Sequence, residues 1–165
     1  MSEAGSTKAF ELVFEGVGRT SGKMRNDISV SFTTMNETFE LATDEGSIHG
    51  GDGTAPPPLA LFTAALTGCL MTQIRAFAKR MKIKVEAAEV SARLHWRAEQ
   101  IDNEPYVSEP VGFALDVQIE ADCSVEQRVA LLNAARKGCF IEQSLTLGTT
   151  ITHRLKTEDG WLDCP

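Results

Sequence analysis

The sequence predicts an α+β fold whose elements follow the order βββ-α-ββ-α-β. Three observations predict it: short alternating stretches fill the first part of the chain, a long apolar stretch follows, and a second group of strands precedes a capped helix. The chain has 165 residues, enough for one domain with its own core. It contains no repeat or internal linker. We therefore expect a single domain over 1–165, with a flexible tail at 1–8 and a loose tail at 158–165.

The first part of the chain has the pattern of a three-stranded meander. Apolar and polar residues alternate from Ala9 to Val17, from Ile28 to Thr33, and again around Phe39. Glycines after the first stretch and Asn36 after the second mark the turns. We expect three antiparallel strands that end near residue 43, each with one face in water.

A loop rich in glycine and proline, residues 44–58, separates these strands from the predicted central helix. A proline suits the first turn of a helix, so we expect the helix to begin near residue 58 and to run to about Lys82. Its first half is apolar on all sides, which predicts burial of that half, including Cys69. The apolar run Leu59–Met71 is too short to cross a bilayer, so we interpret the segment as a core helix.

The remaining elements are a hairpin, a helix and a last strand. Val85–Arg97 and Val111–Glu120 read as two paired strands joined by a polar connection. Ser124 and Gln127 have the spacing of a capping box, which predicts a helix that stops at Gly138. We expect a short helical turn over 139–145, a strand over 149–155, and a loose tail beyond it.

Charge and composition limit the classes of partner. A formal charge of -7 argues against nucleic acid or an anionic membrane as the main partner, and favours small molecules or proteins. The N-terminal residues lack the basic and apolar regions of a secretory signal, so we expect a cytoplasmic protein. The three histidines show no metal-ligand spacing with any cysteine, and we expect neither a metal nor an organic cofactor.

Two of the four cysteines are candidates for redox chemistry. A single cysteine in a helix is more often a small core residue than a nucleophile. Cys69, in the central helix, and Cys139, directly after Gly138, could meet in the fold and cycle between dithiol and disulfide. Cys123 precedes a capped helix and suits packing or the surface, whereas Cys164 lies in the predicted tail.

The residues around these two thiols resemble the OsmC/Ohr superfamily, the osmotically inducible protein C and organic hydroperoxide resistance proteins. One pattern is the loop Gly53–Pro58 followed by an apolar helix that carries Cys69, and another is Ala135–Leu145 around Cys139. A third is the turn Gly18–Gly22, which contains an arginine. The resemblance covers nearly the whole chain.

The resemblance implies an OsmC-like fold, an intertwined homodimer in which antiparallel sheets wrap long central helices, with active sites at the subunit interface. It implies a thiol peroxidase: Cys69 attacks an organic hydroperoxide and becomes a sulfenic acid, Cys139 resolves it to a disulfide, and an external dithiol, for example a lipoyl-type one, resets the pair. The apolar surroundings of Cys69 favour bulky hydroperoxides, with Phe62, Leu66 and Phe140 as substrate contacts.

The same resemblance implies that Arg19 is the cation beside the reacting thiolate. An ordinary cysteine is only about 3% ionised at pH 7, so a cation is needed. Greater ionisation alone gains little rate, because a more acidic thiolate is a weaker nucleophile. We therefore expect Arg19 to act mainly by holding the peroxide in line and by stabilising charge on the departing oxygen.

The sequence departs from the family pattern at the acidic partner of that arginine. Leu59 and Ala60 stand where the family carries a glutamate, and Glu45 or Asp52 could substitute for it. Glu142, one turn after Cys139, could orient a cation or disfavour ionisation of that thiol. Two alternatives to the peroxidase therefore stay open: an OsmC-like dimeric module that binds an apolar ligand without turnover, and a redox sensor.

Overall fold

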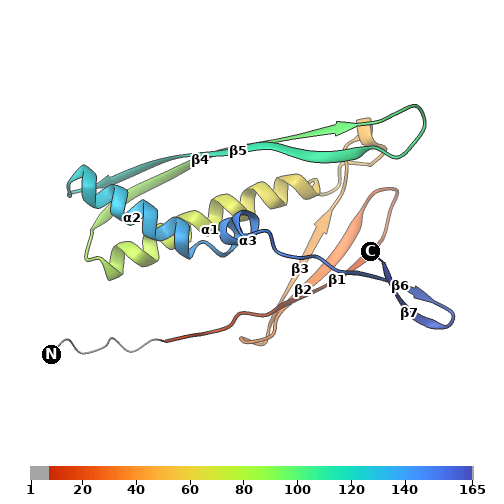
Figure 1. Cartoon of the computed structure of the whole chain (residues 1–165), viewed down its shortest axis with the longest axis horizontal. Helices are drawn as coiled ribbons and strands as arrows, with labels where there is room; N and C mark the ends of the chain where they lie inside the picture. Colours follow the sequence, from red (N-terminus) through yellow and green to blue (C-terminus); the bar gives the residue numbers. More distant parts are fainter. Residues whose placement is uncertain (1–7, 165) are drawn as a thin grey trace. The chain divides into compact units, whose positions relative to one another are not determined.

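The computed structural model describes residues 8–164, and the predicted tail at 1–8 lies outside them except for Lys8. The chain divides into two compact units, one up to Phe62 and one from Thr63 onward, which are described separately. The elements follow the predicted order as far as the second helix (Figure 1). The predicted short helical turn follows, and the predicted last strand at 149–155 begins later, at His153, as the first strand of a terminal hairpin. The α+β class with antiparallel sheets is confirmed, and the single domain stays a prediction.

The first unit contains a three-stranded antiparallel sheet in the order β1-β2-β3, which confirms the predicted meander. The first strand begins at Phe14 and not at Ala9, because β2 ends at Phe32, directly opposite Phe14. The rings of Phe14 and Phe32 stack there with their centroids 4.4 Å apart. The strands are β1, Phe14–Thr20, β2, Asn26–Phe32, and β3, Glu37–Thr43.

The loop after β3 is organised around a buried carboxylate. Asp44 is 1% exposed and accepts hydrogen bonds from the backbone N–H of Glu45 at 2.9 Å and from the backbone N–H and hydroxyl of Thr54 at 2.9 and 2.8 Å. These bonds hold the pKa of Asp44 below its ordinary value, with the Thr54 N–H as the largest cause. A short 3-10 helix, Ser47–His49, lies within the loop.

Helix α1, Pro58–Arg80, confirms the predicted central helix. Its buried residues recur every four positions and form one stripe: Leu66, Leu70, Ile74 and Ala78. The expected all-round burial of the first half is wrong for the single chain, because Ala64, Ala65 and Gly68 are exposed. By length and composition alone α1 could cross a membrane, a test that core helices of soluble proteins also pass.

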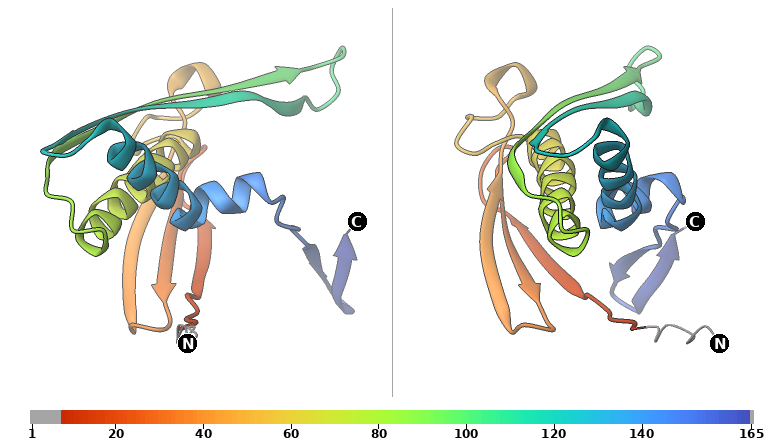
Figure 2. Two further views of the ribbon diagram at one scale, coloured as in Figure 1. Left: turned by 60° about the vertical axis from the view of Figure 1, so that its left-hand side comes forward. Right: turned by 90° about the vertical axis from the view of Figure 1, so that its left-hand side faces the viewer.

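In the second unit, a long hairpin covers α1 and α2 (Figure 2). The strands β4, Val85–Glu99, and β5, Val107–Ala121, confirm the predicted hairpin and extend beyond the predicted limits. Helix α2, Val125–Gly138, has the predicted capping box: the Gln127 N–H donates to the Ser124 hydroxyl at 3.3 Å, and the Ser124 N–H donates to Oε1 of Gln127 at 3.0 Å. The short helical turn is confirmed as α3, Phe140–Thr146.

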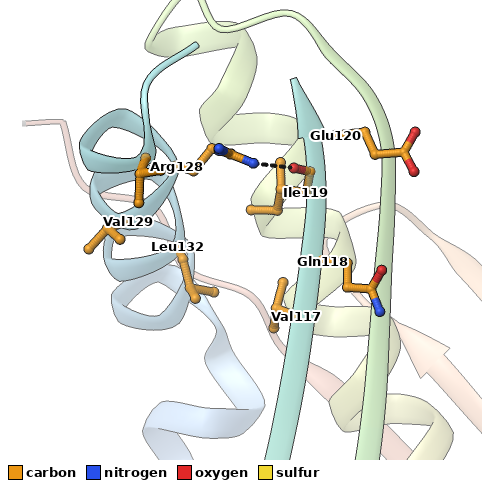
Figure 3. A pocket seen from close by; sticks show the side chains of 8 residues that line it. Val117, Gln118, Ile119, Glu120, Arg128, Val129 and Leu132 are labelled. Carbon is orange, nitrogen blue, oxygen red and sulfur yellow. Dashed lines mark hydrogen bonds between the residues drawn. The ribbon is translucent and has the colours of Figure 1, made fainter. Parts of the chain in front are cut away.

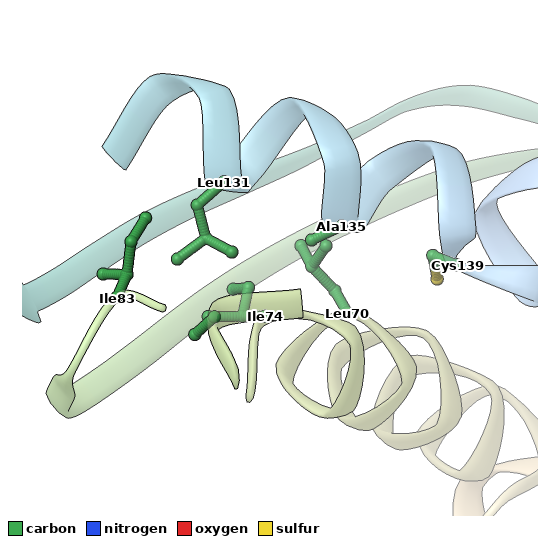
Figure 4. Packing of buried hydrophobic residues seen from close by; sticks show 7 residues of the cluster. Leu70, Ile74, Ile83, Leu131, Ala135 and Cys139 are labelled. Carbon is green, nitrogen blue, oxygen red and sulfur yellow. The ribbon is translucent and has the colours of Figure 1, made fainter. Parts of the chain in front are cut away.

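The hydrophobic core of this unit lies mainly between α1 and α2 (Figure 4). Apolar residues of β4 and β5 pack against it from one face of the hairpin. Its buried members are Leu70, Ile74, Ala78, Ile83, Leu131, Ala135 and Cys139.

The predicted loose tail at 158–165 is wrong for most of its length. Strand β6, His153–Thr157, turns back into β7, Gly160–Cys164, and the two strands pair throughout. Gly160 has a φ of 131°, which a residue with a side chain rarely adopts and which allows the chain to reverse tightly. The guanidinium of Arg154 lies 5.4 Å from the centroid of the Trp161 ring, which adds a cation–π contact across the hairpin.

Candidate dithiol site

The structure brings Cys69 and Cys139 into hydrogen-bonding contact. Cys69 lies on α1 and is half-buried, whereas Cys139 lies between α2 and α3 and is 0% exposed. Both are free thiols. Because α1 and α2 are separated by the whole β4–β5 hairpin in sequence, this contact depends on packing between distant parts of the chain.

Close packing of the two helices explains the contact. Leu70 and Ile74 of α1 pack with Leu131 and Ala135 of α2 within the core (Figure 4). At the end of α2, a Cβ on Gly138 would lie 2.5 Å from the Phe77 ring of α1, closer than atoms can pack. Glycine therefore allows α2 to approach α1 directly before Cys139.

Cys139 sits at the bend between two helices. Its N–H donates to the carbonyl of Arg136 at 3.3 Å, and its own carbonyl accepts from the Gln143 N–H at 2.9 Å. Burial raises the pKa of the Cys139 thiol to about 11, and the hydrogen bond with Cys69 acts in the same direction. The Glu142 backbone N–H, which donates to the sulfur, opposes this change. Cys139 is therefore a neutral thiol at pH 7.

An ion pair spans the same bend. Nε of Arg136 lies 3.0 Å from Oε1 of Glu142; the Arg136 side chain is 57% exposed and that of Glu142 only 15%. Both residues border a cavity of about 250 Å³ whose other walls are apolar. The sequence drew attention to Glu142 but not to Arg136, because a spacing of six residues across a bend matches no helical pattern. The apolar lining residues are Leu70, Phe113, Leu115, Val117 and Leu132.

Arg19 lies on β1 in the first unit, where it is exposed and stands opposite Asp27 in the sheet. The arginine that contacts the loop before α1 is Arg25, whose Nη1 donates to the Thr54 hydroxyl at 2.9 Å. Asp52, a candidate for the missing acid, pairs with Lys23 at 2.8 Å.

The other candidate, Glu45, donates its backbone N–H to Asp44. Asp44 is the buried acid of this loop, and sequence reasoning missed it. Alternation and charge patterns do not distinguish a buried aspartate that organises a loop from its solvated neighbours.

The predicted substrate contacts differ in exposure. Leu66 is buried one turn before Cys69, and Phe62 is half-buried one turn earlier on the same helix. Phe140 begins α3 and is half exposed. Cys123 packs against the core from its edge, and Cys164 ends β7. Within residues 8–164, no group of three or more His, Cys, Asp or Glu side chains could hold a metal ion.

A second and larger cavity, of about 510 Å³, lies between β5 and α2 (Figure 3). Its apolar wall includes Ile119 and Val129, and it shares Val117 and Leu132 with the cavity beside the ion pair. Arg128 reaches across it and donates to the Ile119 carbonyl at 3.5 Å.

Comparison with known proteins identifies related sequences and structures. A family model described as OsmC-like protein matches residues 51–154. The structure of an OsmC-like hydroperoxide resistance protein from Jannaschia sp. CCS1 is 45% identical, covers 93% of this chain and 98% of that chain, and has a TM-score of 0.64. No curated protein matches the chain.

Two more distant structures share the fold. The organic hydroperoxide resistance protein OsmC from Legionella pneumophila is 18% identical, covers 84% of this chain and 91% of that chain, and has a TM-score of 0.56. An organic hydroperoxide resistance protein from Elizabethkingia anophelis is 19% identical, with the same two coverages, 84% and 91%, and a TM-score of 0.53.

Proposed function

The chain belongs to the OsmC-like family, and from that premise we propose that it is a cysteine-based peroxidase that reduces organic hydroperoxides. The observation that carries the proposal is the hydrogen-bonding contact between a half-buried thiol, Cys69, and a buried one, Cys139. The hydroperoxide resistance named for the related protein of Jannaschia supports the same class of substrate.

In the first step, the Cys69 thiolate attacks an oxygen of the hydroperoxide. An S–O bond forms, the O–O bond breaks, and the departing alkoxide takes up a proton and leaves as an alcohol. In the second step, the Cys139 sulfur attacks the Cys69 sulfenic acid, the S–O bond breaks, and water leaves. The product is a disulfide between the two cysteines, which an external dithiol of the lipoyl type reduces by thiol–disulfide exchange.

Burial supports this division of roles. A hydroperoxide reaches a half-buried sulfur more easily than one with no exposed surface, and the raised pKa of Cys139 keeps it protonated during the first step. The disulfide requires the sulfurs to come within about 2.05 Å, and the two thiols are already in hydrogen-bonding contact before oxidation. Formation of the disulfide protects Cys69 from irreversible overoxidation.

The remaining predicted residues complete the proposed site. Arg19 holds the peroxide in line and stabilises the departing oxygen, a role that needs the planar guanidinium. Phe62, Leu66 and Phe140 contact the organic part of the substrate. No metal or organic cofactor takes part in these steps.

Exposed apolar surface supports a homodimer as the functional unit. The outer part of the β4–β5 hairpin exposes Tyr106 and Val107, and the terminal hairpin exposes Trp161 and Leu162. The first half of α1 also leaves apolar residues exposed, including Leu59. A single chain rarely leaves so much apolar surface in water, so a second copy of the chain is the proposed cover.

We infer a soluble, cytoplasmic protein.

The reaction of purified protein with a stoichiometric amount of cumene hydroperoxide tests the peroxidase. We expect the wild type to lose two thiols per chain and to form a disulfide between Cys69 and Cys139, as read by thiol counting and peptide mass. Cys139→Ser is expected to stop at an oxidised Cys69, and Cys69→Ser to be unreactive. Substitution of Cys123 and Cys164 by serine is the matched control and is expected to leave the reaction unchanged.

A wild-type reaction no faster than that of free cysteine would favour a binding module. The cavity between β5 and α2 supports that second candidate, because its apolar wall suits an apolar ligand. Saturable binding of a fluorescent fatty acid without thiol loss would identify it. Reversible disulfide formation without catalytic turnover of peroxide would instead indicate a redox sensor.

A further inference from the structure

The bend that holds Cys139 is braced by both main-chain and side-chain contacts of Arg136. The carbonyl of Arg136 accepts from the Cys139 N–H at 3.3 Å and from Nε2 of Gln143 at 3.1 Å. Its guanidinium binds Glu142 on the far side of the bend. The position of the Cys139 sulfur therefore depends on one residue of α2 and on the first turn of α3.

The charged and titratable groups that bear on Cys139 come from three elements. Cys69 contacts it from α1, the Glu142 backbone N–H donates to its sulfur from α3, and the negative charge of the Glu142 carboxylate disfavours the Cys139 thiolate. Arg136 of α2 reaches Glu142. The strand residues that border the neighbouring cavity, Phe113, Leu115 and Val117, are apolar. Within the described residues, the Glu142 carboxylate and its partner Arg136 are thus the charges of this site.

We propose that the Arg136–Glu142 ion pair is a positioning pair that controls the resolving step. Glu142 slows the attack of the Cys139 sulfur on oxidised Cys69, and Arg136 weakens this effect by binding Glu142. The inference rests on the proposed peroxidase function and adds to it the residues that regulate its second half. This ion pair lies near the buried thiol, and it does not depend on the family glutamate, whose place Leu59 or Ala60 takes in this chain.

The chemistry of the resolving step explains why these charges matter. Cys139 must lose its proton as its sulfur attacks the sulfenic sulfur of Cys69, and the proton leaves with the hydroxide as water. A carboxylate beside the sulfur disfavours the thiolate, and a guanidinium that binds the carboxylate weakens this effect. A tenfold gain in thiolate changes the rate by only about threefold, because the more acidic thiolate is a weaker nucleophile.

Glu142→Gln, Arg136→Gln and the double variant separate this electrostatic role from a structural one. Both single variants break the same ion pair. If the pair only held the bend in place, disulfide formation would therefore be slower in both. The proposal predicts opposite effects: about threefold faster formation in Glu142→Gln, about threefold slower in Arg136→Gln, and a rate near that of wild type in the double variant. Lys137→Gln removes an exposed positive charge next to Arg136 and is the matched control, with no change expected.

Two measurements read the outcome. Single-turnover oxidation with cumene hydroperoxide gives the rate of disulfide formation as a function of pH. Ultraviolet absorbance of the thiolate gives the titration midpoint of Cys139 directly when Cys69, Cys123 and Cys164 are replaced by serine. We expect Glu142→Gln to move this midpoint to lower pH and Arg136→Gln to move it to higher pH.

A change of the same sign in both single variants, or an unchanged midpoint in both, would overturn the inference. The titration needs no peroxide and therefore tests the pair separately from the proposed function. Failure of the wild-type Cys69 to oxidise would reject the peroxidase, whereas normal wild-type oxidation with unshifted variants would reject only the role of the pair.

Discussion

The properties of Cys139 follow from its surroundings. The same side chain that ionises near pH 8.5 in water keeps its proton here until the pH approaches about 11, because burial and contact with Cys69 raise the pKa of Cys139. Core packing and redox chemistry are therefore compatible in this residue. In the reduced protein, this protonated, buried sulfur packs in the core as a small apolar group.

This burial predicts a pH dependence of stability in the reduced protein. The pKa of Cys139 is raised in the folded state, so folding is favoured below the ordinary cysteine pKa of about 8.5, and this stabilisation is lost as the pH rises toward about 11. We expect the Tm of the reduced wild type to fall more over this range than that of Cys139→Ala. Parallel Tm profiles for the two proteins would contradict the burial of an un-ionised thiol.

At the scale of elements, the dithiol depends on how closely α2 approaches α1. The core side chains Leu70, Ile74, Leu131 and Ala135 hold the helices together along their length. Gly138 permits a close approach, against the ring of Phe77, directly before Cys139. The packing of these helices therefore sets the geometry of the dithiol site.

Gly138→Ala tests this coupling. The added methyl group overlaps the Phe77 ring, so we expect a loss of about 1–3 kcal/mol in the free energy of unfolding. Disulfide formation between Cys69 and Cys139 should also slow, because the end of α2 moves away from α1. Chemical denaturation and single-turnover oxidation measure the two effects.

The double variant Gly138→Ala/Phe77→Leu is the control, because a smaller side chain at 77 makes room for the methyl group. Partial recovery of the disulfide rate relative to Gly138→Ala is expected. No loss of rate in Gly138→Ala would show that the close approach is unimportant for the dithiol.

At the scale of the whole molecule, the single chain leaves apolar surface uncovered. On β5, Leu115 and Val117 pack against the core, whereas Val111, further along the strand, is 53% exposed. Trp96 and Phe113 pack edge to face between these regions, with their centroids 4.9 Å apart. The apolar face of the hairpin thus continues past the core of its own unit.

Val111→Glu tests whether a second copy covers this surface. We expect the wild type to have about twice the mass of the 17.9 kDa chain in solution. The variant should dissociate at micromolar concentration and have a lower Tm, because a charge would be buried without a partner. Light scattering measures the mass. Ser108→Glu, at an exposed polar position of the same strand, is the control and should remain dimeric; a monomeric wild type would reject the dimer.

Local signals in the sequence determined the elements. Alternation predicted the meander, prolines and Ser124 marked the helix starts, and Gly138 marked a helix end, because each of these depends on residues that are neighbours in the chain. The same reasoning failed at the C-terminus, where the pairing of β6 with β7 orders residues that have no strong alternation of their own. The first strand starts late for a similar reason, since its partner strand sets its limit.

Which distant residues meet depends on how the helices pack. The resemblance to a family pointed to Cys69 and Cys139, but their contact, the approach of Gly138 to Phe77 and the pairing of Arg136 with Glu142 come from packing of α1, α2 and α3. Such contacts depend on the position of whole helices, and a pattern of neighbours carries no information on that position. The sequence therefore identifies the residues of the dithiol site, and helix packing determines that they meet.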